Sequence, residues 1–423
     1  MSDTRAQAAG QALTIAERLL DPKSIVAAAP KRPGACLQSL AGTALLHARL
    51  SHTDPRFERA AHAHWTAAAT LSPRPRTAAP GVFAAPGGMA TSLILAEGYL
   101  TDPEPQRHAV QQAVRWLSHQ ATAKADTHHE LLRRGPATPA WELYDAITGL
   151  AGIGRILLAA LTNGHDHAEP GLKAALTTLT TIINTPGGRT RPGWWLPADG
   201  HPSTTGVPPS GVAETGMAHG IAGPLALLSI ASSAGWEVDG QTAAIRAAAQ
   251  WLLTWQTPGT TTWPPYITGH ELDNGPPAPT PAAGRRDAWC YGAPGIGRAL
   301  TLAGHALPDP HLAEAGDTAI ASLASRPVHL WDTEGPTLCH GSSGVLQCAA
   351  TRKPATADPA ASSVASAFNP EHLFAVQHLG AGTASDDPGL LTGAAGIALA
   401  LADHGNLPAP ATATRWDAVL LLS

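Results

Sequence analysis

Residues 289–300 read WCYGAPGIGRAL, in which two glycines three positions apart precede a run of small and aliphatic residues. The same Gly-x-x-Gly turn recurs in four other segments: AITGLAGIGRILL (146–158), MAHGIAGPLALL (217–228), LCHGSSGVLQCA (338–349) and LLTGAAGIALAL (390–401). Two degenerate copies precede them: LQSLAGTALL (37–46), with Ser39 at the first glycine position, and FAAPGGMATSL (83–93), with Ala85 there. Seven copies of one unit indicate a repeat architecture.

The spacing of the turns indicates helical hairpins. The second glycines are separated by 46 to 72 residues, which is room for two helices and their loops. Apolar residues follow each turn with helical spacing, and a second amphipathic pattern often precedes the next turn, as in AAIRAAAQWLLTWQ (243–256). We therefore predict an all-α fold in which seven helical hairpins close into an inner and an outer ring, forming a single domain over residues 1–423. An open solenoid is the competing arrangement.

Two segments are longer than a helical hairpin requires, and they carry short runs of Trp, Tyr, Thr and Ile between Pro and Gly clusters. In residues 185–206 and 257–287 this composition predicts short strands and loops, which either line a substrate entrance or form plain surface loops. The stretch RKPATADPAASSVAS (352–366) has the composition of a linker.

Composition excludes several classes of protein. The 423-residue chain has a formal net charge of −5 and a pI near 6.5, so no basic face for nucleic acid is expected. No apolar stretch is long enough to span a bilayer, and the start, MSDTRAQAAG, lacks the pattern of a signal peptide. The four cysteines do not make a disulfide framework. These features predict a soluble protein in the reducing cytoplasm.

Aligning the turns places two cysteines in one slot. Cys290 and Cys339 each lie two residues before the first glycine of consecutive repeats, and His340 follows Cys339. Equal slots in consecutive repeat units lie at equal height on adjacent inner helices, so the two thiols are expected to meet. Two thiolates and one imidazole are three ligands for tetrahedral Zn²⁺, which leaves the fourth position for water or substrate. The pattern predicts a catalytic zinc site.

The other two cysteines lie outside this slot. Cys36 and Cys348 are interpreted as small buried hydrophobic residues, which is the usual role of a lone cysteine. The same interpretation is the alternative to a metal site for Cys290 and Cys339. A redox pair is disfavoured, because the chain contains no Cys-x-x-Cys motif.

Three polar residues are candidates for catalytic roles at the same end of the barrel. His219 in MAHGIAG occupies the slot that His340 holds two repeats later, and a core or capping histidine is the alternative. Asp145 and Arg286 lie just upstream of turns, where a structural ion pair or a helix cap is the alternative to a catalytic role.

Taken in order, HGIAG, WCYGAPG and CHGSSG resemble the lanthionine synthetase C-like proteins, the lanthipeptide cyclases, and the resemblance extends through the repeats over essentially the whole chain. The resemblance implies an α,α-toroid with a catalytic zinc. The implied ligands are Cys290, Cys339 and His340, and the implied polar catalytic residues are His219, Asp145 and Arg286. The chain departs from the family pattern at Ser342 and Ser343 and in its two eroded first repeats, and Arg285 competes with Arg286 for the inward-facing position.

The implied activity is the addition of peptide cysteine thiols to dehydroalanine or dehydrobutyrine, which forms lanthionine and methyllanthionine thioether rings. The chain resembles the stand-alone cyclase of two-enzyme systems. The implied partners are a dehydrated precursor peptide of leader plus core, a lanthipeptide dehydratase and an exporter. Two alternatives stay open: a zinc-dependent thiol alkyltransferase that uses another electrophile, and a non-catalytic peptide-binding scaffold of a modification complex. The open fourth position argues against the scaffold, because structural zinc sites usually have four protein ligands.

Overall fold

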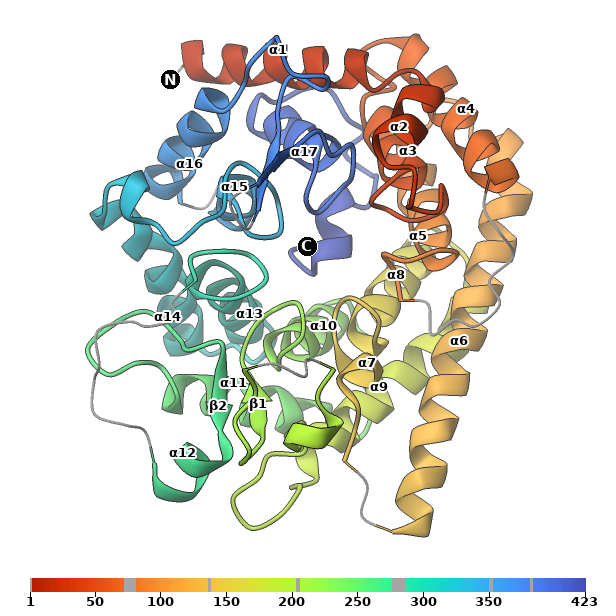
Figure 1. Cartoon of the computed structure of the whole chain (residues 1–423). Coiled ribbons are helices and arrows are strands. Elements are labelled where there is room, and N and C mark those ends of the chain that lie inside the picture. Colours follow the sequence, from red (N-terminus) through yellow and green to blue (C-terminus); the bar gives the residue numbers. More distant parts are fainter. Residues whose placement is uncertain are drawn as a thin grey trace.

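In the computed structural model the helices form two concentric rings, which Figure 1 shows end-on. The structure describes residues 2–71, 81–135, 138–202, 206–275, 286–349, 353–380 and 383–423. Within these residues, seven inner helices begin inside the repeated turns: α3 (Leu40–Arg49), α5 (Gly87–Ala96), α8 (Leu150–Thr162), α10 (Ala222–Ser233), α13 (Ala293–Ala306), α15 (Ser342–Ala349) and α17 (Ala394–His404). The predicted turns therefore mark the starts of the inner helices.

The outer ring completes the hairpins. Over the same residues, six outer helices each follow the inner helix on which they pack: α4 (Pro55–Leu71), α6 (Arg107–Arg134), α9 (Glu169–Asn184), α11 (Gln241–Thr254), α14 (Pro310–Ala321) and α16 (Pro354–Ser366). The seventh, α1 (Ser2–Arg18), packs on α17 from the other end of the chain. Each inner helix contacts the next, and α17 contacts α3. The predicted ring is thus confirmed, and the open solenoid is wrong.

Burial distinguishes the two layers. Every residue of α3 is buried, as expected for a helix that is enclosed by neighbours on all sides. The outer helix α6 instead buries one stripe at helical spacing: Val110, Ala113, Val114, Leu117, Ser118, Ala121, Ala125 and His128. The core therefore lies between the rings and around the inner helices. No helix within the described ranges is both long and apolar enough to cross a membrane.

A circle of backbone hydrogen bonds joins the turns. In each described turn, the carbonyl of the residue two positions before the first glycine position accepts a hydrogen bond from the preceding turn. The accepting residues are Leu37, Phe83, Ile147, Ala218, Cys290, Cys339 and Leu391. Leu390 N–H donates to Leu37, which closes the circle. The circle holds equivalent slots at one height, as the repeat argument predicts.

Two glycines show why the turn motif requires this residue type. Gly292 has φ of +108°, and a Cβ built there would lie 1.7 Å from the carbonyl oxygen of Arg286. A Cβ at Gly344 would lie 2.1 Å from the carbonyl oxygen of Leu338 and 3.2 Å from the Cβ of Trp289 on the neighbouring turn. The first glycine permits the turn, and the second permits close approach between adjacent turns.

The predicted excursions meet in a small sheet. Strand β2 (Tyr266–Thr268) lies inside residues 257–287 and pairs antiparallel with β1 (Val212–Glu214). Leu196 forms a single bridge to Val212, so the strand associated with the first excursion begins just beyond the predicted range of 185–206. Residues 203–205 and 276–285 lie outside the described part of the chain.

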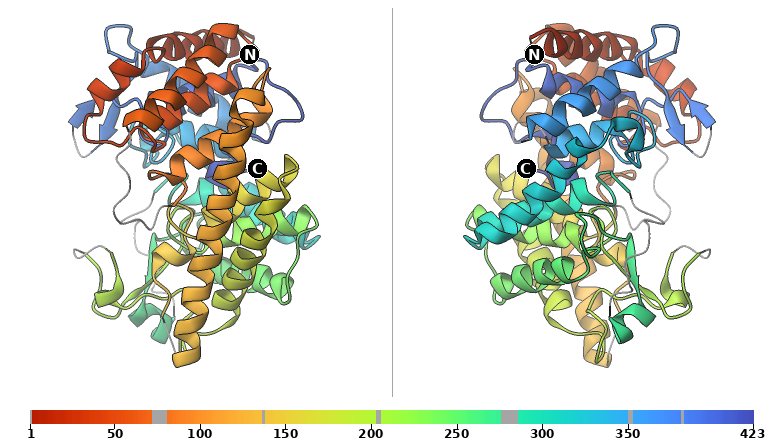
Figure 2. Two further views of the ribbon diagram at one scale, coloured as in Figure 1. Left: turned by 90° about the vertical axis from the view of Figure 1, so that its right-hand side faces the viewer. Right: turned by 90° about the vertical axis from the view of Figure 1, so that its left-hand side faces the viewer.

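A second strand pair was not predicted from the sequence. It joins β3 (His378–Gly380) to β4 (Thr383–Ser385). Both strand pairs lie on the same face of the ring in the side views (Figure 2). Among the described residues, the three α-helices outside the two rings are short: α2 (Pro22–Ala28), α7 (Trp141–Tyr144) and α12 (Gly269–Asn274).

The prediction of a linker at 352–366 is wrong, because Pro354–Ser366 forms the outer helix α16. Its small residues hide a helical period, since the buried positions are Thr356, Ala357, Ala360, Ala361 and Val364. Alanine has the highest helix propensity, and Pro354 occupies the first turn, where proline is tolerated. Composition alone therefore misassigned a segment whose periodicity is helical.

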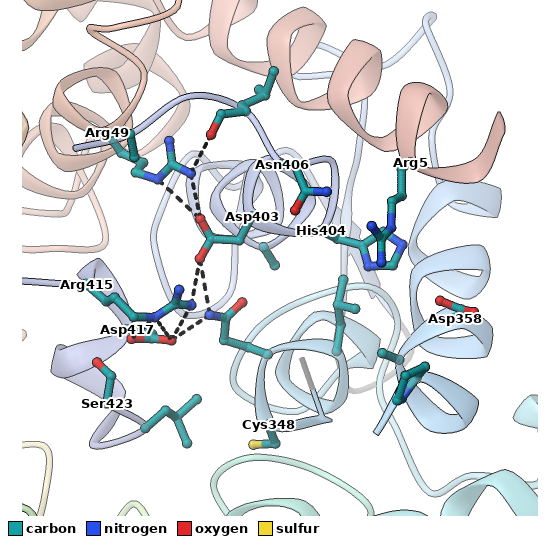
Figure 3. Close-up of a pocket in the computed structure, with 18 of the residues that line it drawn as sticks. Arg5, Arg49, Cys348, Asp358, Asp403, His404, Asn406, Arg415, Asp417 and Ser423 are labelled. Carbon is teal, nitrogen blue, oxygen red and sulfur yellow. Dashed lines mark hydrogen bonds and ion pairs between the residues drawn. The ribbon is translucent and has the colours of Figure 1, made fainter. Parts of the chain in front are cut away.

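The last described residues occupy the centre of the ring. A 3₁₀ helix, Trp416–Leu420, is fully buried and contacts α5 and α8. At the C-terminal ends of the inner helices, a pocket of about 680 Å³ contains a network of ion pairs that holds this segment (Figure 3). Asp403 joins Arg49 at 2.9 Å to Arg415 at 3.0 Å. Ion pairs therefore hold the chain at this end of the ring, which lies opposite the end where the repeated turns lie.

Candidate metal and catalytic centre

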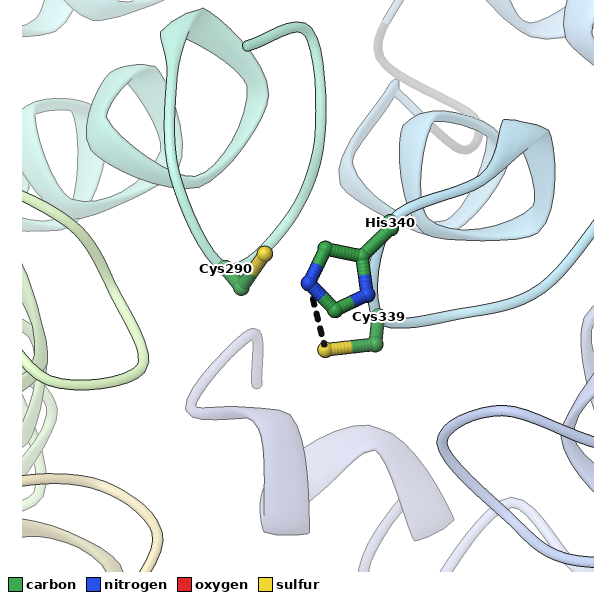
Figure 4. Close-up of side chains that lie close together, drawn as sticks. All are labelled: Cys290, Cys339 and His340. Atoms are coloured by element: carbon green, nitrogen blue, oxygen red, sulfur yellow. Dashed lines mark hydrogen bonds between the residues drawn. The ribbon is translucent and has the colours of Figure 1, made fainter. Parts of the chain in front are cut away.

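The structure brings Cys290, Cys339 and His340 together, as predicted. Their ligand atoms all lie within 4.8 Å of one another, and Figure 4 shows the three side chains converging from two adjacent turns. Cys290 N–H donates to the carbonyl of Cys339 with an N···O distance of 3.4 Å, so the circle of backbone bonds sets their separation. In the described ranges, this is the one cluster of three Cys, His, Asp or Glu residues that could hold a metal ion.

Electrostatics within this trio favour one thiolate. Hydrogen bonds from Cys339 and, to a smaller extent, His340 together lower the pKa of Cys290 to about 5, against the effect of burial. The hydrogen bond to Cys290, burial and the negative charge of Cys290 raise the pKa of Cys339. The hydrogen bond to Cys290 likewise raises the pKa of His340. The site therefore concentrates negative charge on sulfur, which a cation would stabilise.

The donor set fits Zn²⁺. In tetrahedral coordination, Zn–S bonds of about 2.3 Å and Zn–N bonds of about 2.0 Å place ligand atoms roughly 3.5–3.8 Å apart. The Cys339 Sγ to His340 Nε2 distance is 3.9 Å, and the remaining pairs lie within 4.8 Å. Closing onto an ion requires shifts of less than about 1 Å. Soft thiolates with one imidazole are the ligands that zinc prefers, and three of them leave one coordination position open.

His219 lies on the turn next to Cys290 and is held by Asp145. The N–H of Ala218 donates to the carbonyl of Cys290 at 3.2 Å, so the turn that carries His219 adjoins the trio of Cys290, Cys339 and His340. His219 Nδ1 lies 2.7 Å from Asp145 Oδ2. The carboxylate of Asp145 is fully buried, whereas 24% of the His219 side chain is exposed. One carboxylate therefore orients an imidazole that remains accessible.

The second oxygen of Asp145 fixes the carboxylate itself. Asp145 Oδ1 accepts hydrogen bonds from the N–H groups of Ile147, Thr148 and Gly149 at 3.1, 2.7 and 2.6 Å. These bonds fix the turn that precedes α8, so Asp145 has a structural role in this turn in addition to its bond to His219. The two interpretations of Asp145 are thus compatible.

Arg286 is close to the trio but is engaged by a carboxylate that the sequence did not indicate. Its Nη1 lies 2.5 Å from Glu334 Oε1, and both side chains are about one-third exposed. The N–H of Glu334 donates to the carbonyl of His340 at 2.8 Å. The positive charge of Arg286 also partly offsets the rise in the pKa of Cys339 and of His340. Arg285, the alternative to Arg286 in the sequence, lies outside the described residues.

The structure adds an aromatic residue that sequence reasoning missed. The Trp141 indole stacks on the His219 imidazole with ring centroids 4.0 Å apart and planes 11° apart. Trp141 lies one helical turn before Asp145, whose N–H donates to the Trp141 carbonyl at 3.0 Å. The sequence did carry one signal for this contact: Trp141 lies four residues before Asp145, and residues four apart share a helix face.

Cys36 and Cys348 are both free and buried. Burial raises the pKa of each thiol. Neither belongs to the metal-binding cluster found among the described residues. Their positions agree with the interpretation that they are core residues.

Comparisons with known proteins give a family match and a similar fold. The family model described as "Lanthionine synthetase C-like protein" matches residues 35–421 of the chain. Among solved structures, nisin cyclase is similar, with a TM-score of 0.77 and 18% sequence identity over 96% of each chain. A search of curated proteins finds no match. The structural likeness demonstrates the toroid fold, and the family match extends over nearly the whole chain.

Proposed function

Because this chain belongs to the lanthionine synthetase C-like family, we propose that it is a zinc-dependent cyclase of dehydrated peptides. It adds peptide cysteine thiols to dehydroalanine or dehydrobutyrine and so forms lanthionine and methyllanthionine rings. The observation that carries this proposal is the cluster of three donors, Cys290, Cys339 and His340, beside the turn that carries a carboxylate-held histidine. A metal that activates a nucleophile and an accessible acid–base group are the two requirements of this chemistry.

The trio supplies the nucleophile. Bound Zn²⁺ would be held by Cys290, Cys339 and His340 and would lower the pKa of a substrate thiol in its open position. With Cys290 and Cys339 as thiolates, the centre would be electron-rich, which would favour attack of the substrate sulfur on an electrophile. The polarity of the trio, with negative charge already gathered on Cys290, is consistent with this role.

The proton balance assigns a role to His219. Addition forms the C–S bond, breaks the C=C π bond and shifts that electron pair toward the adjacent carbonyl oxygen; the α-carbon then takes a proton. Because Asp145 accepts from Nδ1–H, Nε2 is the nitrogen that can receive the thiol proton and return it to the α-carbon. The product is an isomer of the substrate, with no change in mass.

Arg286 is the proposed group that stabilises negative charge on the substrate carbonyl. Its guanidinium lies beside the trio and is held by Glu334 at 2.5 Å. A fixed cation next to developing negative charge lowers the barrier without reorganisation at the moment of reaction. About one-third of the Arg286 side chain is exposed, so a substrate can reach it.

The substrate chemistry defines the partners. Dehydroalanine and dehydrobutyrine arise by loss of water from serine and threonine, so a dehydratase must act before this enzyme. We therefore propose a dehydrated precursor peptide, leader plus core, as substrate, with a lanthipeptide dehydratase and an exporter as partners. Free thiols in the site and in the substrate suit the reducing cytoplasm.

The test uses the zinc-loaded chain and a peptide that carries one dehydroalanine and one cysteine. A cyclase removes the free thiol at unchanged peptide mass, after the uncatalysed addition is subtracted. A thiol alkyltransferase would require a second electrophile and would add its mass, and a scaffold would bind the peptide without thiol loss. Either of the last two results overturns the proposal.

A further inference from the structure

We propose that Trp141 is a positioning residue for His219, and that its indole face sets the plane in which the imidazole works. This inference rests on the proposed cyclase function and concerns a residue outside the predicted site. Trp141 does not belong to the repeated turn motif, and the contact connects the third repeat to the fourth.

Two residues near the third turn, Asp145 and Trp141, contact His219 from different directions. Asp145 holds Nδ1 in the plane of the ring at 2.7 Å, and Trp141 lies against the ring face with centroids 4.0 Å apart. A single hydrogen bond fixes one ring atom but permits rotation of the imidazole plane about that bond. The stacked indole removes this remaining freedom, because tilting the ring would break the 11° parallel contact.

Trp141 is itself supported from the first excursion. His201 packs edge-on against the indole, with ring centroids 5.1 Å apart and planes 78° apart. His201 Nε2 lies 3.3 Å from Glu214 Oε1 on β1, and each of these side chains is about 5% exposed. The small sheet therefore anchors Glu214, which holds His201 against Trp141. His201, from the excursion at 185–206, therefore supports Trp141.

This arrangement has a kinetic consequence. Positioning matters for the proton transfer step, whereas peptide binding depends on a larger surface. Replacing the indole should therefore lower kcat and leave KM nearly unchanged. The stacking energy typical of an aromatic pair corresponds to a rate effect of about tenfold.

The experiment compares Trp141→Leu with Trp141→Phe in the zinc-loaded full chain. Leucine keeps apolar bulk without a ring face, so kcat should fall about tenfold, with KM within about twofold. Phenylalanine restores a ring face and should keep kcat within about threefold of wild type. Trp236→Leu is the matched control, since Trp236 is also half-buried but follows the C-terminal end of α10, away from the turns. Trp141→Met provides a second non-aromatic variant if the leucine variant fails to fold.

A spectroscopic readout separates positioning from general stability. Aromatic ring currents displace the signals of protons held over an indole face, so the His219 ring protons should show displaced NMR signals in wild type. Trp141→Leu should lose the displacement, and Trp141→Phe should retain much of it. Equal loss of kcat in both variants, or wild-type kcat in Trp141→Leu, would overturn the inference.

The parallel variant His219→Asn distinguishes the two proposals. If His219→Asn cyclises at the wild-type rate, the proposed function of His219 fails, and the role of Trp141 fails with it. If His219→Asn is slow and Trp141→Leu is unaffected, only the inference about Trp141 is wrong.

Discussion

Replacing Asp145 by asparagine tests how much the proposed cyclisation depends on the orientation of His219. Asparagine can present its oxygen to the same three backbone N–H groups, so the turn that precedes α8 keeps its hydrogen bonds. Its amide nitrogen then faces His219 Nδ1, which is 2.7 Å from the oxygen that it replaces. An amide N–H cannot accept from Nδ1–H, so the imidazole must change its tautomer or turn away.

The expected fall in kcat follows from the loss of the hydrogen bond between His219 and Asp145. A hydrogen bond to a charged group contributes about 1.5–3 kcal/mol, so kcat should fall about 10- to 150-fold. The free energy of unfolding should change by about 1 kcal/mol or less, because the acceptor for these N–H groups remains. Asp145→Ala, which leaves the three N–H groups, that of Gly149 buried, without their acceptor, should cost about 1–3 kcal/mol of stability in addition to activity.

The assay is a time course of thiol loss on a dehydrated peptide, beside zinc content and a urea unfolding curve for each variant. Asp145→Asn should keep its zinc and its unfolding midpoint while cyclisation slows. Wild-type kcat in this variant would refute the claim that Asp145 orients His219. A loss of zinc in proportion to the loss of activity would refute the separation between the histidine and the metal trio.

Three further changes have distinct outcomes. Cys290→Ala should lose most bound zinc by metal analysis, whereas Cys348→Ala should retain it; full retention in both would eliminate the trio. His219→Asn should retain zinc while cyclisation falls about 100-fold or more, and His340→Asn should lose zinc and activity together; equal zinc loss in both variants would contradict their separate roles. Burial lowers the pKa of His47 to about 3, so the unfolded state takes up a proton first as the pH falls. The free energy of unfolding should therefore decrease below about pH 6.5, by up to about 1.4 kcal/mol per pH unit, and His47→Gln should flatten this slope in urea titrations.

The sequence predicted the hairpins because the Gly-x-x-Gly turns repeat, and the structure confirms a turn at the start of each inner helix among the described residues. Closure was harder to predict. It depends on α17 meeting α3 and on α1 packing against α17, contacts between residues roughly 350 to 400 positions apart. The α1 segment carries no repeated turn, so local pattern gave no sign of its place. The helix at Pro354–Ser366 was missed because small residues concealed its period.

The meeting of Cys290, Cys339 and His340 was predictable for a physical reason. Cys290 and Cys339 occupy one slot, and the circle of backbone bonds turns equal slots into neighbours. The family prediction is confirmed by the match over residues 35–421. The contacts of Trp141 with His219 and of Glu334 with Arg286 were not predictable, because they join different repeats through side chains that belong to no shared slot.

Zinc K-edge X-ray absorption on the purified chain, with and without bound substrate, tests the central claim most directly. The proposed centre predicts about one zinc per chain with two sulfur ligands, one histidine nitrogen and one light atom from water. Adding a dehydrated peptide with a free cysteine should convert the light ligand to a third sulfur. Absence of zinc, or a shell of four protein ligands that substrate does not alter, would contradict the claim.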